Sequence, residues 1–370
     1  MESQDLFYGP DRIEFSKAFG RPIRKGDFEQ IKVSDFDKVK QALEKKDQEK
    51  AMSYLGLMHA LYTATNSTFF EWGIALPSTL SSKGYKELEP KITKESFEIW
   101  LEGAIEQYKH NETIELMKLA LQNLNPESIK DFREKQQKNE SNQATVLFQN
   151  AFEHYKNLTE SIANKDFDNA KMYFANYFGE MRLLHDLAGE FVSTYISRIE
   201  EKTSQKIAAD VMQHSLESCP FVAGMWSLVE SITPEELSAV MAEHLRCHFS
   251  GKDRKGSVEI VEDEEKYRLI FEPCGTGQAL RLRNIKGLTK FPEASPETWN
   301  LKNEVPPYCS HCARNEITSI SILGYPAWVT EFNPDPKKPC GWTIYKDPKL
   351  IPEKYFKRLG LEKDETKFKT

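Results

Sequence analysis

The chain has 370 residues, of which 39% are hydrophobic, 29% charged and 11% aromatic. This composition supplies enough apolar material for two cores and excludes disordered and collagen-like chains. Acidic side chains outnumber basic ones by 57 to 50, for a net charge of −7, so no overall positive field favours nucleic acid as a partner. The apolar runs are far shorter than the roughly 20 residues that cross a bilayer, and the first residues lack a signal-peptide pattern. We therefore expect a cytoplasmic protein without a membrane partner.

Residues 34–213 repeat their apolar side chains at spacings of three and four, which predicts a helical region. One apolar stripe starts near Leu43 and is expected to end at Pro77, and a second runs over 170–196. Both stripes begin with the same Asp-x-x-x-Ala-x-x-Tyr spacing, which indicates a degenerate repeat of helical hairpins that pack as one bundle. The polar, charged segment 125–142 between them predicts a connecting loop.

The pattern changes in the last third of the chain. Thr233, Pro234 and Glu236 form a capping-box sequence, which predicts a helix over 234–249. Apolar and polar residues then alternate over 258–271 on either side of an acidic turn, which predicts a β-hairpin. Four further short strands are expected at 279–283, 317–323, 327–330 and 341–345.

These elements predict an α+β fold. The N-terminal part, 1–215, is expected to be an all-α helical bundle, and 216–370 a smaller α+β domain that carries a cysteine cluster and binds a metal. A short helix near the C-terminus, from about residue 352, completes this expectation.

All six cysteines follow residue 218, and four of them have the layout of a metal site. Cys309 and Cys312 form a Cys-x-x-Cys pair, while Cys274 and Cys340 each lie in a Pro-Cys-Gly tripeptide. Four thiolates suit zinc first and iron second. A site of three sulfurs with His311 or water as the fourth ligand is equally consistent with the spacing, and such a site leaves a coordination position for chemistry.

Three histidines are the candidate catalytic groups. His244 and His248 lie one helical turn apart near the end of the capped helix, together with Cys247, so they could converge on one point as ligands or as an acid/base group. Their position at the border of the apolar face is equally consistent with an ordinary structural role. The third candidate, His311, lies inside the Cys-x-x-Cys pair.

Two more histidines, His59 and His185, lie on or beside the apolar stripes of the helical region. A buried histidine with a hydrogen-bond partner is more often structural than catalytic. Their possible partners are Glu71, Glu180, Asp186 and Glu190.

The order of the cysteines, with Cys274 at a strand end, Cys309 and Cys312 in a loop and Cys340 on a final strand, gives the C-terminal third a resemblance to L-2-amino-thiazoline-4-carboxylate hydrolase-like proteins. It covers about 150 residues (194–345). The resemblance implies a cytosolic enzyme that opens a carbon–nitrogen or carbon–sulfur bond in a small heterocycle, with the cysteine region as its active site. Cys274 and Cys340 match the order, whereas His311 departs from it, because an aspartate is expected near that position. The helical region has no counterpart there.

Together these patterns predict a metal-dependent enzyme, most simply a hydrolase, that acts on a small molecule. In this hypothesis the four cysteines hold zinc, with iron as the alternative, His311 or His248 transfers protons, and the helical region covers the pocket. A metal-bound water would be the nucleophile. Two alternatives stay open: a non-catalytic ligand-binding or assembly protein with a closed, structural four-cysteine zinc site, and a metal-free thiol redox protein that uses Cys309 and Cys312. A homo-oligomer also stays open.

Overall fold

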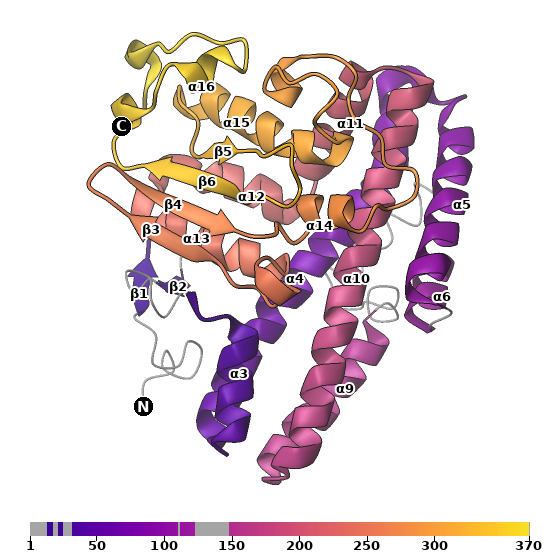
Figure 1. Ribbon diagram of the computed structural model, residues 1–370, viewed down its shortest axis with the longest axis vertical. Coiled ribbons are helices and arrows are strands. Elements are labelled where there is room, and N and C mark those ends of the chain that lie inside the picture. The colour runs from indigo at the N-terminus through magenta and orange to yellow at the C-terminus, as the bar shows by residue number, and fades with distance from the viewer. Residues whose placement is uncertain (1–12, 18–20, 25–31, 110–111, 123–147, 370) are drawn as a thin grey trace.

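The computed structural model describes residues 13–17, 21–24, 32–109, 112–122 and 148–369. The expected connecting loop at 125–142 therefore lies outside the described residues. Helices make up most of the described chain, and a small antiparallel sheet packs against one end of them (Figure 1). The longer helices are α3 (Asp35–Glu44), α4 (Gln48–Leu80), α5 (Glu89–Tyr108), α6 (Glu112–Gln122), α9 (Gln149–Ala163), α10 (Phe167–Lys202), α11 (Gln205–Glu217), α12 (Pro220–Leu228), α13 (Pro234–Cys247) and α15 (Ser310–Leu323).

Two helical hairpins, α3–α4 and α9–α10, form the long part of the molecule, as the repeated spacing predicts. Each long helix begins with an aspartate N-cap: the Asp47 side chain accepts from the amide of Lys50, and Asp166 accepts from that of Asn169. Such caps satisfy backbone donors that have no partner inside the helix. In both hairpins a lysine with positive φ directly precedes the cap. The two turns therefore have the same local design.

Pro77 does not end its helix, contrary to expectation, because α4 continues to Leu80. Proline removes one backbone donor from the last turn. The hydroxyls of Ser78 and Thr79 both donate to the carbonyl oxygen of Ala75, at 3.0 and 2.8 Å. These bonds help to hold the turn in place at the end of the helix.

The sheet has the order β3-β4-β6-β5, and all its neighbours are antiparallel. Its first two strands form the predicted hairpin, and the capping box of Thr233 and Glu236 starts α13 as predicted. Helix α13 packs against β4 and β6. The strands of this sheet are β3 (Glu259–Glu262), β4 (Lys266–Phe271), β5 (Val329–Glu331) and β6 (Cys340–Tyr345), and a separate strand pair is formed by β1 (Ile13–Ser16) and β2 (Arg21–Arg24).

Two expected strands are helices instead. Residues 279–283 overlap α14 (Gly277–Leu282), and 317–323 form the second half of α15. The buried positions of α15 include Ala313, Glu316, Ser319 and Leu323, so its helical period is carried largely by small and polar side chains. The β-branched residues that favour a strand there lie between them. The strands expected at 327–330 and 341–345 are present, with slightly different ends, as β5 and β6.

One large cluster of buried apolar side chains runs from α3 through the long helices to the sheet, and a second, small cluster of Val329, Ile351 and Phe356 lies under the C-terminal segment. The expected C-terminal helix is short, α16 (Lys354–Lys357), with Phe356 fully buried. Among the helices that the structure describes, none combines the length and the apolar character needed to cross a membrane.

Candidate functional site

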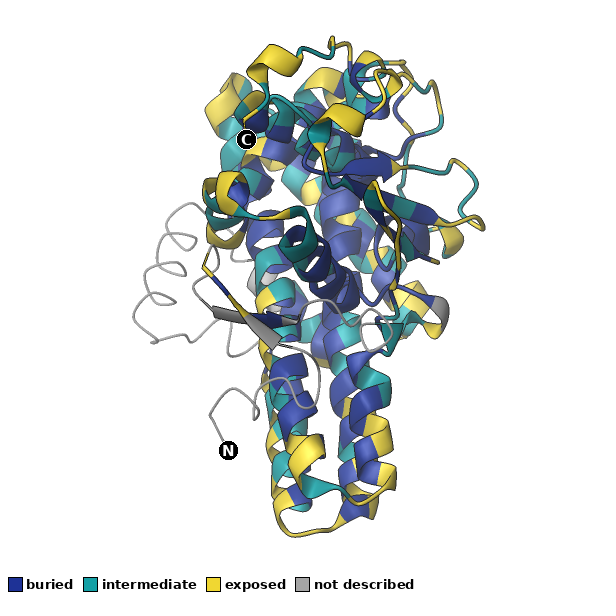
Figure 2. Cartoon of the chain, turned by 90° about the vertical axis from the view of Figure 1, so that its left-hand side faces the viewer, coloured by how far each residue is buried: buried dark blue, intermediate teal, exposed yellow. Residues whose placement is uncertain are grey.

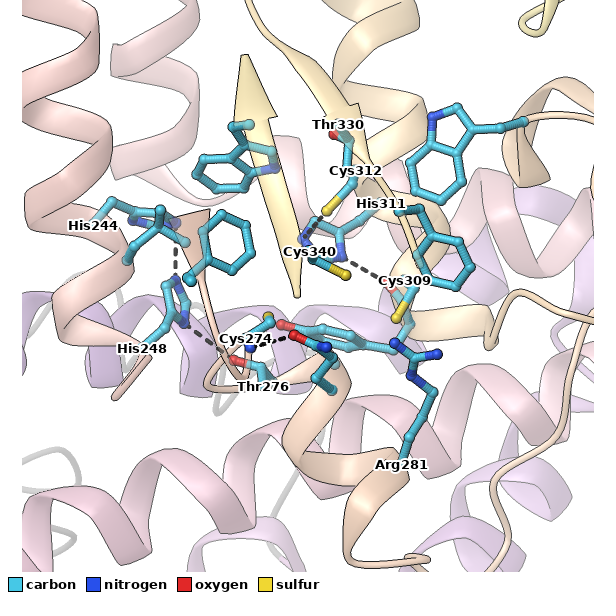
Figure 3. Close-up of a pocket in the computed structure, with 18 residues that line it drawn as sticks. His244, His248, Cys274, Thr276, Arg281, Cys309, His311, Cys312, Thr330 and Cys340 are labelled. Atoms are coloured by element: carbon cyan, nitrogen blue, oxygen red, sulfur yellow. Dashed lines mark hydrogen bonds between the residues drawn. The ribbon is translucent and has the colours of Figure 1, made fainter. Parts of the chain in front are cut away.

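A cavity of about 580 Å³ lies where the ends of the central strands β4 and β6 meet α13, α14 and α15 (Figure 3). Its walls contain the four candidate metal ligands and the three candidate catalytic histidines, whereas Cys247, at the end of α13, is buried and does not line it. These residues come from four separate segments: the end of α13, the loop after β4, the start of α15 and the start of β6. The seven are His244, His248, Cys274, Cys309, His311, Cys312 and Cys340.

The sheet and one helix start bring the four cysteines together. Phe271, at the end of β4, pairs with Cys340, at the start of β6, so the loop with Cys274 leaves the sheet beside Cys340. Cys309 ends a short 3₁₀ turn and Cys312 lies in the first turn of α15. The resemblance implied that the Cys-x-x-Cys pair lies in a loop, but the structure places it at the start of a helix. Residues three apart share a face of a helix.

The loop after β4 packs too closely for any side chain at its two glycines. A Cβ on Gly275 would lie 1.5 Å from the carbonyl oxygen of His248, and one on Gly277 would lie 2.7 Å from Sγ of Cys309. The amide of Gly275 donates to Oγ of Ser250 at 3.2 Å. The glycines thus let the Cys274 loop contact both the end of α13 and the Cys-x-x-Cys pair.

All six cysteines are free thiols. Burial raises the pKa of Cys309 to about 12 and that of Cys340 to about 11, and it raises the pKa of Cys312 well above its usual value. The other three cavity thiols also act electrostatically on Cys312 and raise its pKa further. The three buried thiols are accordingly protonated at neutral pH.

Within the described ranges, no group of three or more His, Cys, Asp or Glu side chains is arranged to hold a metal ion. The four thiols line the wall of one cavity but do not form such a group. Rotation about a Cα–Cβ bond moves a cysteine sulfur without moving the backbone, and the donor set is the one that zinc and iron prefer. Metal binding therefore stays a prediction.

His311 and Cys312 form a thiol–imidazole pair. Nδ1 of His311 lies 2.6 Å from the carbonyl oxygen of Tyr308, and Nε2 lies 3.5 Å from Sγ of Cys312 (Figure 3). Because a carbonyl oxygen only accepts, Nδ1 carries the proton and Nε2 accepts from the thiol. Burial lowers the pKa of His311 to about 4, so the imidazole is neutral near pH 7 and its Nε2 keeps the lone pair that accepts from the thiol.

The other two cavity histidines belong to a buried chain of side chains. Nε2 of His248 lies 2.9 Å from Nε2 of His244, and Nδ1 of His248 lies 3.1 Å from Nε2 of His185. His185 is fully buried and its Nδ1 lies 3.2 Å from the carboxylate of Asp186. His185 is thus linked to the site, whereas His59 lies elsewhere, between Tyr155 and Tyr177.

These three linked histidines are neutral near pH 7. Burial lowers the pKa of His244 to about 4, and it lowers the pKa values of His185 and His248 as well. Asp186 behaves differently: burial alone would raise its pKa, but the charges of Arg254 and Arg283 and the hydrogen bond from His185 hold it well below its usual value. A fixed negative charge therefore lies at the buried end of the chain.

Arg281 is a cavity residue that the sequence did not single out. Its Nη1 donates to the carbonyl oxygens of Asn333 and Pro334, at 3.1 and 2.9 Å, and its guanidinium lies 5.0 Å from the ring centre of Phe332. Nε and Nη2 are buried and have no oxygen or nitrogen partner in the part of the chain that the structure describes. Its charge also lowers the pKa of Cys340, although burial outweighs this effect. No local motif marks Arg281, because its neighbours suggested a strand.

A second cavity of about 690 Å³ lies on the helical side of the same histidines. Phe69 and Trp72 of α4 and Val222 of α12 line it, together with His244, His248 and His311, which face both cavities. The helical region therefore lines this second cavity, whereas none of its described residues lines the first cavity, which it was expected to cover. Comparison of the chain with models of known families, with curated proteins and with solved structures finds no match.

Proposed function

We propose that the protein is a metal-dependent enzyme that hydrolyses a carbon–nitrogen or carbon–sulfur bond of a small molecule bound in the Cys/His cavity. One observation carries this proposal: seven chemistry-bearing side chains from four separate segments line a single cavity. A structural thiol cluster alone would not require three histidines and an arginine beside it. The bond type comes from the resemblance of the cysteine order, which implies such a reaction.

Cys274, Cys309, Cys312 and Cys340 are the residues that would hold the metal, with zinc favoured over iron. Their thiols are free and share one wall, and a metal would displace the protons that burial otherwise retains. A bound zinc or iron would supply a Lewis acid that lowers the pKa of water.

The remaining cavity residues have roles of their own in this proposal. The imidazoles of His244, His248 and His311 are neutral near pH 7 and supply polar groups that would orient a substrate in the cavity. The guanidinium of Arg281, which also interacts with the thiol of Cys340, is a planar, positively charged donor group that suits an anionic group of the substrate. The rings of Phe271 and Trp342 offer apolar walls for the rest of a small molecule.

A second candidate is metal-free thiol catalysis, and the 3.5 Å contact between Cys312 and His311 favours it. Here Sγ of Cys312 would attack the carbon of the scissile bond while its proton passes to Nε2 of His311. The imidazole would then protonate the leaving nitrogen or sulfur, and water would release the product from the sulfur. Nucleophile, base and an orienting carbonyl are the parts that such catalysis needs.

The first experiment measures metal content and reactive thiols on the full chain, expressed without a metal-affinity tag. We expect about one zinc or iron per chain, and about four thiols that become reactive once a chelator removes it. Cys340→Ser should lose the metal. Cys219→Ser is the matched control, since Cys219 is a buried cysteine that does not line the cavity, and this variant should keep it.

A chain that carries no metal in any preparation would overturn the metal-dependent proposal. If Cys312 then reacts selectively with iodoacetamide, and His311→Gln slows that reaction at least tenfold, thiol catalysis replaces it. If no cavity thiol reacts before the protein unfolds, both candidates fail.

A further inference from the structure

The buried end of the histidine chain lies outside the cavity and has no role in the proposed function so far. Asp186 lies within α10, and its carboxylate accepts two hydrogen bonds from Arg254 at 2.6 Å and one from Arg283 at 3.1 Å. The fourth contact of the carboxylate, at 3.2 Å, is with Nδ1 of His185. A carboxylate bound by two arginines is ionised and only accepts. Nδ1 of His185 must therefore carry a proton.

This proton position determines the rest of the chain. A neutral imidazole has one donor and one acceptor nitrogen, so Nε2 of His185 accepts, and Nδ1 of His248, 3.1 Å away, donates to it. Nε2 of His248 then accepts from Nε2 of His244 at 2.9 Å. Thr276 lies beside the first of these bonds, with its Oγ1 3.1 Å from His185 and 3.3 Å from His248, where it can donate to the first and accept from the second.

We propose that Asp186 is a positioning residue of the site, which acts through His185 to fix the tautomers and orientations of His248 and His244. The proton positions are Nδ1 on His185, Nδ1 on His248 and Nε2 on His244. The consequence for chemistry rests on the proposed function: the two cavity imidazoles meet a substrate in one protonation pattern, with no reorientation at the moment of reaction.

The surroundings of Asp186 make a sharp substitution available. In Asp186→Asn we expect the amide oxygen to replace Oδ2, which accepts from both arginines, and the amide NH2 to replace Oδ1, which faces His185. Nη2 of Arg254, which donates to Oδ1 in the wild type, keeps the carbonyl oxygen of Gly275 as its acceptor. Nδ1 of His185 must then accept, and its proton moves to Nε2. Each following bond reverses its direction, so we expect Nε2–H on His185, Nε2–H on His248 and Nδ1–H on His244. One substitution should invert three tautomers.

Long-range ¹H–¹⁵N correlation spectra of the full chain with labelled histidine, recorded near pH 7.5, read the tautomers directly. Protonated and unprotonated ring nitrogens have well-separated shifts, and single His→Gln variants assign the signals. The wild-type pattern alone tests the proposal, even where the Asn variant does not fold. Asp186→Glu, which restores an acceptor, should return the wild-type pattern.

Glu316→Gln is the matched control. Glu316 is also a fully buried carboxylate bound by an arginine, Arg358, but it does not contact the three histidines, so their tautomers should not change. A wild-type pattern other than the one stated, or an Asp186→Asn protein that keeps the wild-type tautomers, would overturn the proposal. The tautomers are read without metal or substrate, so this failure is distinct from failure of the proposed function.

Discussion

The lower half of α10 (167–180) and its upper half (184–197) differ in how far their residues are buried, and this difference locates the site. From Phe167 to Glu180 buried and exposed residues alternate, as in an ordinary amphipathic helix, whereas every residue from Leu184 to Ser197 is buried. Figure 2 shows the same contrast, with exposed residues along the hairpin end and a buried mass above it. The upper half also buries polar side chains, including His185, Asp186 and Glu190.

Such burial is costly unless each polar group has a partner. In the upper half the partners come from the C-terminal third of the chain: His248, Arg254 and Arg283 all reach α10. The lower half packs against α9 in a hairpin. The comparison shows that one helix serves as a scaffold at one end and as part of a site at the other.

The largest effect on stability should come from a substitution in the loop after β4, which carries Cys274 and packs against the end of α13. Gly275→Ala places a Cβ 1.5 Å from the carbonyl oxygen of His248, a clash with backbone that no rotamer relieves. We expect a loss of about 4 kcal/mol or more in the free energy of unfolding, or no folded protein. Urea unfolding followed by circular dichroism measures it. A loss below about 1 kcal/mol would show that the loop is not packed as described.

The next largest effect should come from truncating an apolar side chain, and its size should differ between the two halves of α10. Leu187, in the upper half, is fully buried, whereas Met172, in the lower half, is 49% exposed. Leu187→Ala should lower the free energy of unfolding by about 3 to 4 kcal/mol, because it leaves a cavity. Met172→Ala should change it by less than about 0.5 kcal/mol. Equal effects in the same urea assay would contradict the comparison.

Glu190, in the upper half, should make the free energy of unfolding depend on pH, and the direction follows from its pKa shift. Burial raises its pKa to about 7, although Arg283 opposes the shift. A raised carboxyl pKa stabilises the folded protein below the unfolded value of 4.5, and this contribution is lost as the pH rises towards 7. Glu190→Gln should therefore gain stability relative to the wild type by roughly 2 to 3 kcal/mol between pH 4.5 and pH 7.5.

Unfolding curves of both proteins across this pH range test that difference. The buried histidines, whose pKa values are lowered, act in the opposite direction, since their contribution is lost as the pH falls below 6.5. They are common to both proteins and cancel in the comparison. A pH-independent difference would show that Glu190 is ionised like an exposed carboxylate.

The smallest expected effect is a gain in the free energy of unfolding. Gly179 lies in the lower half of α10, and a Cβ there would meet nothing within 4 Å. Gly179→Ala should raise the free energy of unfolding by about 0.5 to 1 kcal/mol, because alanine loses less conformational freedom in a helix. A loss of stability in the same assay would mean that the lower half is packed more tightly than the structure shows.

Local signals were enough to predict much of the fold. Repeated spacings of three and four, the capping box at Thr233 and the alternation around the acidic turn each specify an element from neighbouring residues alone. The helix α15 was missed because its buried face includes Glu316, whose partner Arg358 lies 42 residues away. No pattern within the helix reveals that pair.

The same distinction applies to the site. The cysteines and three of the histidines could be chosen from spacing and residue type, and the cavity brings them together. Arg281 and Thr276 could not, since each lies in an unremarkable stretch and gains its role from the fold. The link from His185 to His248 spans 63 residues, and only the tertiary fold, which brings the end of α13 to α10, creates it.

The central claim is that the four cysteines of the cavity bind one metal ion beside the cavity histidines. A crystal of the tag-free full chain, with anomalous scattering recorded at the zinc and iron edges, tests it most directly. We predict one peak inside the cavity, within bonding distance of at least three of the sulfurs of Cys274, Cys309, Cys312 and Cys340. No peak there, or a metal bound away from these thiols, would contradict the account.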